Sequence, residues 1–148
     1  MNPIQIIVGS MLGGTEYVAE ACEQTLNELG FKTTLHLSPS LEEIPYENQT
    51  WLVCTSTHGA GDYPDNLLEF ANAVNKQDPV YQTTSLLVIG VGDTNYDTFC
   101  FAAKNLNKLL ISKGCKPIIE PLYLDMAQDI DPEEMAQQWI ETNKDHLS

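Results

Sequence analysis

The sequence predicts an α/β fold in which a doubly wound parallel sheet of five strands carries helices on both faces. Short apolar runs alternate with segments of helical periodicity along the whole chain. The runs are apolar at nearly every position, which is typical of strands buried on both faces of a parallel sheet. Glycine-bearing loops follow three of the runs, and open α/β sheets bind ligands where such loops meet, at the carboxyl ends of the strands.

The chain has the size of one domain. Its 148 residues suffice to bury a core without disulfides or metals, and 43% of them are hydrophobic. No repeat, linker or low-complexity segment divides the sequence, so residues 1–148 are expected to form a single domain.

The first predicted strand is the apolar run from Ile4 to Val8, which ends at Gly9 and Ser10. A helix is predicted next, because apolar residues recur every three or four positions before Gly30, which is expected to end it. The residues at this spacing are Val18, Cys22, Thr25, Leu26 and Leu29.

The second and third predicted strands flank a polar connection. Residues 32–37 alternate between polar and apolar, and residues 51–56 form a buried run. Residues 38–50 between them are the polar connection. A helix is predicted over residues 66–76, and the segment Pro64-Asp65-Asn66 marks its start.

The strongest strand pattern in the chain covers residues 85–91. A long helix is predicted after it, and Gly114 closes this helix. The positions of the helix expected to face the core are Phe99, Ala103, Leu106, Leu109 and Leu110.

The chain is expected to end with one more strand and one more helix. Residues 116–124 predict the fifth strand. The last helix is expected to start after Asp131-Pro132, with Asp131 as its N-cap. Its inward-facing residues are expected to be Met135, Trp139 and Ile140.

The net charge of the chain is strongly negative. There are 21 acidic and 7 basic residues, so the formal charge is −14. This charge repels phosphate backbones and anionic lipids, which argues against nucleic acid and membrane surfaces as partners. Two explanations of the acidity stay open: a device for solubility, or attraction to a basic protein partner.

The chain is expected to be cytoplasmic. Its N-terminal segment lacks the basic region and long apolar core of a signal peptide, and the longest apolar stretch, residues 86–91, is far shorter than the roughly 18 residues of a membrane helix. The cysteines show no CxxC pair and no metal-ligand spacing, so free structural thiols are expected. They are Cys22, Cys54, Cys100 and Cys115.

The loop after the first strand has the composition of a phosphate site. Gly13 and Gly14 let the backbone approach an anion, while Ser10 and Thr15 place hydroxyls beside the free amides of a helix N-terminus. The loop has no lysine or arginine and no GxxxxGK[ST] pattern, so it suits a monophosphate ester better than a triphosphate with magnesium. A plain tight turn is the alternative explanation of the glycine pair.

The other two loops suit a planar ring. Tyr96 offers a flat aromatic face in the loop after the fourth strand, and Gly92 lets the backbone approach a ligand edge. His58 holds the corresponding place after the third strand. Packing or a solvent-facing turn also explains each residue alone, and their position beside the phosphate loop favours one composite site.

Three segments carry a resemblance to a known family: SMLGGTEYVAE at residues 10–20, STHGAGDYPDN at 56–66 and GVGDTNYDTFC at 90–100. The last two are similar to the FMN-binding loops of flavodoxins and of the flavodoxin-type domains of diflavin reductases. Over its full length the chain resembles a short-chain flavodoxin of the MioC type. The resemblance implies a flavodoxin-like strand order of 2-1-3-4-5 with FMN at the switch point and no insertion in the last strand.

The resemblance also implies a set of cofactor-binding residues, with no catalytic side chain and no metal ligand. The first loop would wrap the FMN phosphate, Tyr96 would stack on the outer face of the isoalloxazine, and Gly59 would turn its carbonyl toward flavin N5. The full set is Ser10, Met11, Leu12, Gly13, Gly14, Thr15, Thr57, His58, Gly59, Ala60, Gly61, Gly92, Asp93, Asn95, Tyr96, Phe99 and Cys100.

Two residues depart from the pattern of the family. Leu12 stands where the family usually has a threonine hydroxyl, which bears on phosphate affinity. His58 stands where many members have an aromatic ring against the inner face of the flavin, which bears on the redox potentials.

The function implied by the resemblance is that of a monomeric one-electron carrier between a flavodoxin reductase, or a similar basic redox partner, and a downstream acceptor. Such a carrier turns over no substrate of its own. The acidic residues in or beside the loops suit a basic partner, and they are Asp62, Asp65, Asp93 and Asp97. Two alternatives stay open: a flavin-dependent quinone or nitro reductase, and an interaction module of the same fold without flavin.

Overall fold

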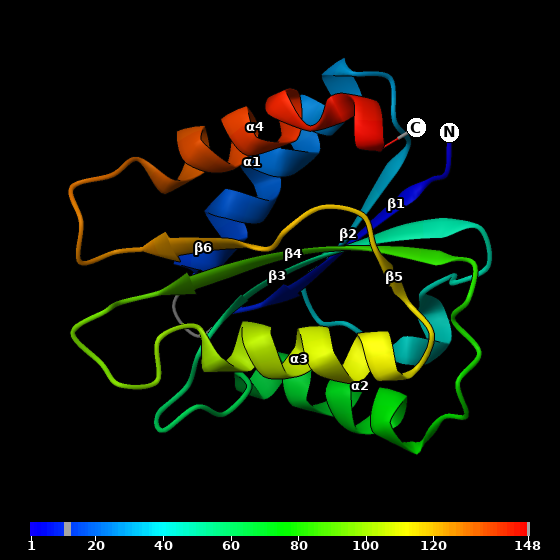
Figure 1. Cartoon of the computed structure of the whole chain (residues 1–148), viewed down its shortest axis with the longest axis horizontal. Helices are drawn as coiled ribbons and strands as arrows, with labels where there is room; N and C mark the ends of the chain where they lie inside the picture. Colours follow the sequence, from blue (N-terminus) through cyan, green and yellow to red (C-terminus); the bar gives the residue numbers. More distant parts are fainter. Residues whose placement is uncertain (11–12, 148) are drawn as a thin grey trace.

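A parallel sheet between two layers of helices forms the protein (Figure 1). The computed structural model describes residues 1–10 and 13–147. The strands are β1 (Ile4–Gly9), β2 (Thr33–His36), β3 (Gln49–Ser56), β4 (Thr84–Gly92), β5 (Lys116–Pro117) and β6 (Leu122–Asp125). All pair in parallel in the order β2-β1-β3-β4-β5, with β6 also on β4, which confirms the predicted strand order and fold class.

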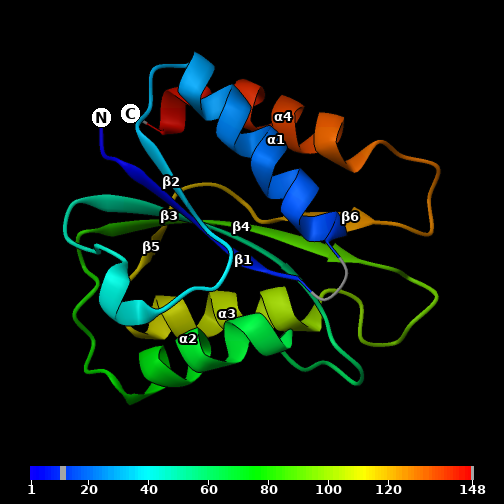
Figure 2. The same ribbon diagram turned by 180° about the vertical axis from the view of Figure 1, so that it is seen from behind.

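The helices lie in pairs on the two faces of the sheet. They are α1 (Gly14–Glu28), α2 (Asp65–Lys76), α3 (Phe101–Ser112) and α4 (Pro132–Thr142), with short 3₁₀ turns at Leu41–Glu43 and Lys144–His146. Helices α1 and α4 cover one face, and α2 and α3 cover the other (Figures 1 and 2). In the part of the chain that is described, no helix is both long and apolar enough to cross a membrane.

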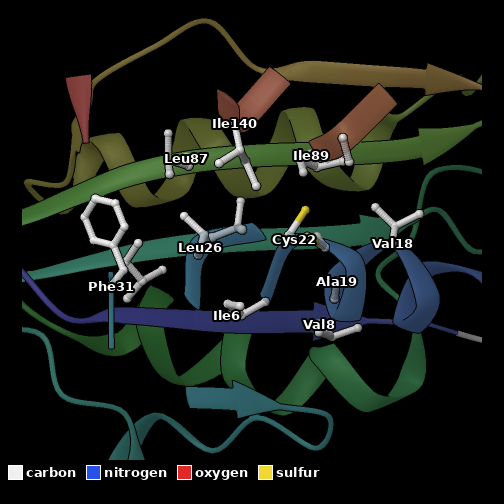
Figure 3. Close-up of a cluster of buried hydrophobic side chains, with 14 of the residues drawn as sticks. Ile6, Val8, Val18, Ala19, Cys22, Leu26, Phe31, Leu87, Ile89 and Ile140 are labelled. Atoms are coloured by element: carbon white, nitrogen blue, oxygen red, sulfur yellow. The ribbon is translucent and has the colours of Figure 1, made fainter. Parts of the chain in front are cut away.

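Each face of the sheet has its own core, because alternate side chains of a strand point to opposite faces. Ile6 and Val8 of β1 pack under α1 and α4 with residues such as Leu26 and Ile140 (Figure 3). Ile7, one position between them, packs on the other face. Burial on both faces is the physical reason why the central strands β1, β3 and β4 are largely apolar in sequence.

The last strand differs from the prediction. One strand was expected over residues 116–124, whereas the structure has two short ones, β5 and β6, that both pair with β4. Pro117 and Pro121 stand at the break and lack the N–H that a continuous ladder needs. The interruption is short, at residues 118–121, and the amide of Ile118 still donates to Leu86 O at 3.3 Å.

The helix ends agree with their sequence signals, but the predictions for two single residues need correction. Asp131 caps α4, since its carboxylate accepts from the amide of Glu134 at 3.1 Å. The predicted inward position of Met135 is wrong: its side chain is 38% exposed, and Ala136 is buried instead. Phe99 precedes α3, which begins at Phe101, so its inclusion in that helix was also wrong.

Candidate functional site

Three loops meet at one edge of the sheet, where β1, β3 and β4 end. Parallel strands place all their carboxyl ends on the same edge, so the loops that follow them lie together there. The chain leaves β1 for β2 on one side and later returns to β3 on the other, which makes the β1 and β3 ends the switch point of the sheet. Two adjoining hollows open at this edge.

The first hollow lies at the start of α1 and has a volume of about 460 Å³. It is lined by Ser10, Gly14, Thr15, Tyr17, Val18, Ser56, Thr57, Val91, Met126, Pro132 and Glu133. Ser10 and Thr15 bring hydroxyls to it, and Thr15 is only 3% exposed. The start of a 15-residue helix faces the same space, and its first amides have no partner within the helix.

The turn into α1 depends on Gly13. This residue precedes the helix with φ +89°, a left-handed backbone that favours glycine. Its amide donates to Ser10 Oγ at 3.0 Å, which fixes the serine hydroxyl across the turn. No Cβ would clash at Gly13 or Gly14, so the loop leaves open space beside the backbone. Predicted site residues Met11 and Leu12 lie outside the described residues.

The second hollow has a volume of about 360 Å³ and lies beside the first. It is lined by Thr57, Gly59, Val91, Gly92, Asp93, Tyr96, Thr98, Phe99, Cys100 and Met126. The hollows share Thr57, Val91 and Met126. Tyr96 is 68% exposed, so an aromatic face at the mouth of the hollow is open to stacking.

Asp125 holds the loop after β4. Its carboxylate accepts from the amide of Thr94 at 3.0 Å, from Thr94 Oγ1 at 2.7 Å and from the amide of Ala127 at 3.0 Å. Desolvation is the largest single influence and raises the pKa of Asp125, but the hydrogen bonds together outweigh it, so the pKa lies below its usual value. The hydrogen bonds of the Asp125 carboxylate therefore stabilise the loop fully above the ordinary aspartate pKa. This stabilisation is lost as the pH falls through the lowered pKa of Asp125.

The loop after β3 is closed on itself and tied to the loop after β4. The amides and carbonyls of His58 and Asp62 pair in both directions at 2.8 Å, which makes residues 58–62 a tight turn. Thr98 Oγ1 donates to the carbonyl of Gly59 at 3.4 Å, and Thr57 Oγ1 accepts from the amide of Ala102 at 3.1 Å. Gly59, for which a role of the backbone carbonyl was predicted, lines the second hollow, and this carbonyl accepts the hydrogen bond from Thr98.

Most of the predicted site residues lie together, and some do not. Those that line the two hollows are Ser10, Gly14, Thr15, Thr57, Gly59, Gly92, Asp93, Tyr96, Phe99 and Cys100. Those outside both linings, among the residues described, are Gly13, His58, Ala60, Gly61 and Asn95. The side chain of His58 is exposed and lines a separate hollow of about 390 Å³ with Tyr63 and Leu68.

Gly92 lines the second hollow, and the absence of its side chain also matters for packing. A Cβ at this position would lie 2.9 Å from Cys100 Sγ and 3.1 Å from the backbone nitrogen of Cys100. The missing side chain therefore makes room for Cys100, which immediately precedes α3 with φ +54° and is fully buried. Burial raises the pKa of the Cys100 thiol to about 11, so the thiol stays protonated at neutral pH.

All cysteines are free and buried, as predicted. Burial raises the pKa of the Cys115 thiol to about 12. A hydrogen bond with Cys22, together with burial, raises the pKa of Cys54. Protonated, buried thiols are poor nucleophiles and poor metal ligands. Over residues 1–10 and 13–147, no three His, Cys, Asp or Glu side chains form a group that could hold a metal ion.

The prediction missed several residues of the site. Met126 contributes to both hollows and is 45% exposed, and Ser56, Val91 and Tyr17 also line them. Met126 follows β6 directly, so the rule that identified the three loops applies to it as well. No glycine follows this strand end, in contrast to the three loops that the sequence indicated.

A hollow larger than either of these lies elsewhere among the described residues. It has a volume of about 580 Å³ and is lined by residues 41–47 together with Ala73, Gln77, Val80 and Tyr81. None of the three glycine-bearing loops contributes to it. The convergence of helix amides, hydroxyls and an exposed aromatic ring at the other edge makes that edge the candidate site.

Comparison with known proteins gives consistent results. Residues 6–139 match the family model described as Flavodoxin. The chain is 44% identical to protein MioC of Escherichia coli K12 and 32% identical to flavodoxin YqcA of the same strain, each over 95% of both chains. Among solved structures, a single-residue mutant of flavodoxin from Pseudomonas aeruginosa has a TM-score of 0.89 at 31% identity, over 98% of both chains.

Proposed function

The chain belongs to the flavodoxin family, and from this premise we propose that it binds one FMN and carries electrons one at a time between a reductase and a downstream acceptor. The observation that supports FMN most strongly is the first hollow, in which the N-terminus of α1 and the hydroxyls of Ser10 and Thr15 converge. FMN, when bound, supplies the redox chemistry, and the protein holds and orients it. The proposal describes a cytoplasmic, monomeric carrier.

The residues present fit the two ends of FMN. The first hollow offers neutral donors to a phosphate, and the second offers Tyr96 to a planar ring. Helix amides and hydroxyls at the end of β1 suit a terminal monophosphate, and the sequence has no dinucleotide-binding fingerprint with a ribose-binding acid. We therefore infer that FMN is preferred over FAD.

Titration of apoprotein with FMN and FAD tests the cofactor. We expect one FMN per chain, detected by quenching of flavin fluorescence, and weaker binding of FAD. Tighter binding of FAD would contradict the site. A chain that takes up neither flavin would be an interaction module, and rapid turnover of nicotinamide and quinone by the FMN-loaded protein alone would make it a reductase.

Replacement of Tyr96 by alanine should weaken FMN binding and shift the redox potentials. An aromatic stack contributes about 0.5–1.5 kcal/mol beyond the burial of area, and its strength differs between oxidised and reduced flavin. Because Tyr96 is 68% exposed, the fold should be unaffected. The affinity is measured by fluorescence titration and the potentials by spectroelectrochemistry.

Ile111→Ala is the matched control for Tyr96→Ala. Ile111 is an apolar residue, 41% exposed, near the opposite end of α3. Its replacement should leave both quantities unchanged. If Tyr96→Ala also keeps wild-type affinity and potentials, the ring does not contact the flavin.

The acidic residues near the site should attract a basic reductase. Asp65 and Asp97 are exposed and lie beside the two loops. Exposed charges mainly accelerate encounter and are screened beyond about 8–10 Å at moderate ionic strength. The double variant Asp65→Asn/Asp97→Asn should therefore be reduced more slowly by its partner at low salt, with nearly unchanged FMN affinity, as measured by stopped-flow absorbance.

A control with the same change in net charge separates local attraction from overall charge. Asp78 and Asp145 are exposed and follow the C-terminal ends of α2 and α4, at the opposite edge of the sheet. Asp78→Asn/Asp145→Asn should alter the rate much less. Equal effects of the two double variants, or rates independent of salt, would place the docking face elsewhere.

A further inference from the structure

Asn66 joins three separate segments through one side chain. Its Oδ1 accepts from the backbone amide of Ser10 at 3.0 Å. Its Nδ2 donates to the carbonyls of Val8 at 3.0 Å and Leu37 at 2.9 Å. The amide therefore uses both donors and its acceptor at once, and it ties the first turn of α2 to the ends of β1 and β2.

The contacts of Asn66 continue into the first hollow through Ser10. The amide of Ser10 is held by Asn66, while its hydroxyl accepts from the amide of Gly13 at 3.0 Å. Gly13 in turn is the residue that immediately precedes α1. Hydrogen bonds thus run from Asn66 through Ser10 to the helix N-terminus, although Asn66 itself lines neither hollow.

We propose that Asn66 is a positioning residue for the phosphate of the bound cofactor, which it serves by fixing Ser10; this inference rests on the proposed FMN site. Ser10 and Gly13 lose less conformational freedom on binding a ligand when hydrogen bonds already hold them before it binds. Asn66 fixes the residue at which the loop leaves β1. Its effect should therefore fall on the phosphate end of the ligand and not on the ring.

The test compares a ligand with a phosphate and the same ligand without one. Dissociation constants of FMN and riboflavin are measured for wild type, Asn66→Ala, Ser10→Ala and the double variant. We expect Asn66→Ala to weaken FMN binding by about 5- to 100-fold, the range that follows from loss of one partly buried hydrogen-bonding group, and riboflavin binding by less than about threefold. A merely structural role would weaken both ligands equally.

The double variant shows whether Asn66 acts through Ser10. Residues in one hydrogen-bond network have non-additive effects. We expect the double variant to lose little more FMN affinity than Asn66→Ala alone. Asn72→Ala is the matched control, because Asn72 lies on the same helix and is exposed. It should bind both ligands like wild type.

The outcomes separate this inference from the proposed function. If the wild-type protein binds no FMN, the proposed function is overturned. If the wild-type protein binds FMN and Asn66→Ala has the same ratio of FMN to riboflavin affinity as wild type, only the role of Asn66 is overturned. If Asn66→Ala does not fold, the isosteric Asn66→Asp takes its place. It retains an acceptor for Ser10 but loses both donors, and it is measured in about 1 M salt, where charge repulsion is screened within about 3 Å. An unchanged ratio there also overturns the proposal.

Discussion

Replacement of Trp51 by alanine should lower the free energy of unfolding by about 3–5 kcal/mol, the usual cost of truncating a large core aromatic residue. Trp51 is fully buried on the face of the sheet covered by α2 and α3. Its ring packs against Phe70 at 5.7 Å and Tyr81 at 5.2 Å between centroids. Its Nε1 also donates to the carbonyl of Pro45 at 2.8 Å, so truncation removes a hydrogen bond as well as apolar contacts.

Urea denaturation of the apoprotein measures this loss. Trp139 is the only other tryptophan and serves as the fluorescent probe in Trp51→Ala. Trp51→Phe is the control: it keeps most of the ring and loses the N–H, so a smaller loss is expected. A loss below about 1 kcal/mol in Trp51→Ala would contradict the assigned packing. Because Trp51 lies near the start of β3, away from the loops, the folded variant should bind FMN like wild type.

Replacement of Thr15 by valine should weaken FMN binding by about 1–3 kcal/mol, the cost of losing a hydrogen bond to a charged group. Thr15 lines the first hollow from the first turn of α1 and is 3% exposed. Valine has nearly the same shape, so the change removes the hydroxyl with little effect on packing. Fluorescence titration with FMN measures the loss, and riboflavin, which lacks the phosphate, should bind to the variant as to wild type.

Thr25→Val provides the control for Thr15→Val. Thr25 lies on the same helix, is 4% exposed and is far from the helix N-terminus. Its replacement should leave FMN affinity unchanged. If Thr15→Val also binds FMN like wild type, the backbone amides of α1 hold the phosphate without help from this hydroxyl.

The sequence predicted those parts of the fold that depend on near neighbours. Asp131-Pro132 marks the start of α4 because an N-cap and a proline at the first helical position act within one turn. Residues 85–91 form a strand because each is apolar or small and burial on both faces requires it. Met135 was misplaced because helical spacing fits more than one face, and contacts with α1 decide which face is buried.

Sequence patterns alone established the fold class and the three loops that carry the candidate site, and family resemblance supplied the strand order. The tertiary structure was needed to show that the side chain of His58 lies on a separate hollow, that Met126 belongs to the site, and that Asn66 holds Ser10 across 56 positions of sequence. Local patterns report which residues are apolar or can turn the chain. The direction of a side chain in a loop depends on contacts with segments far away in sequence, which form only when the sheet brings the strand ends together.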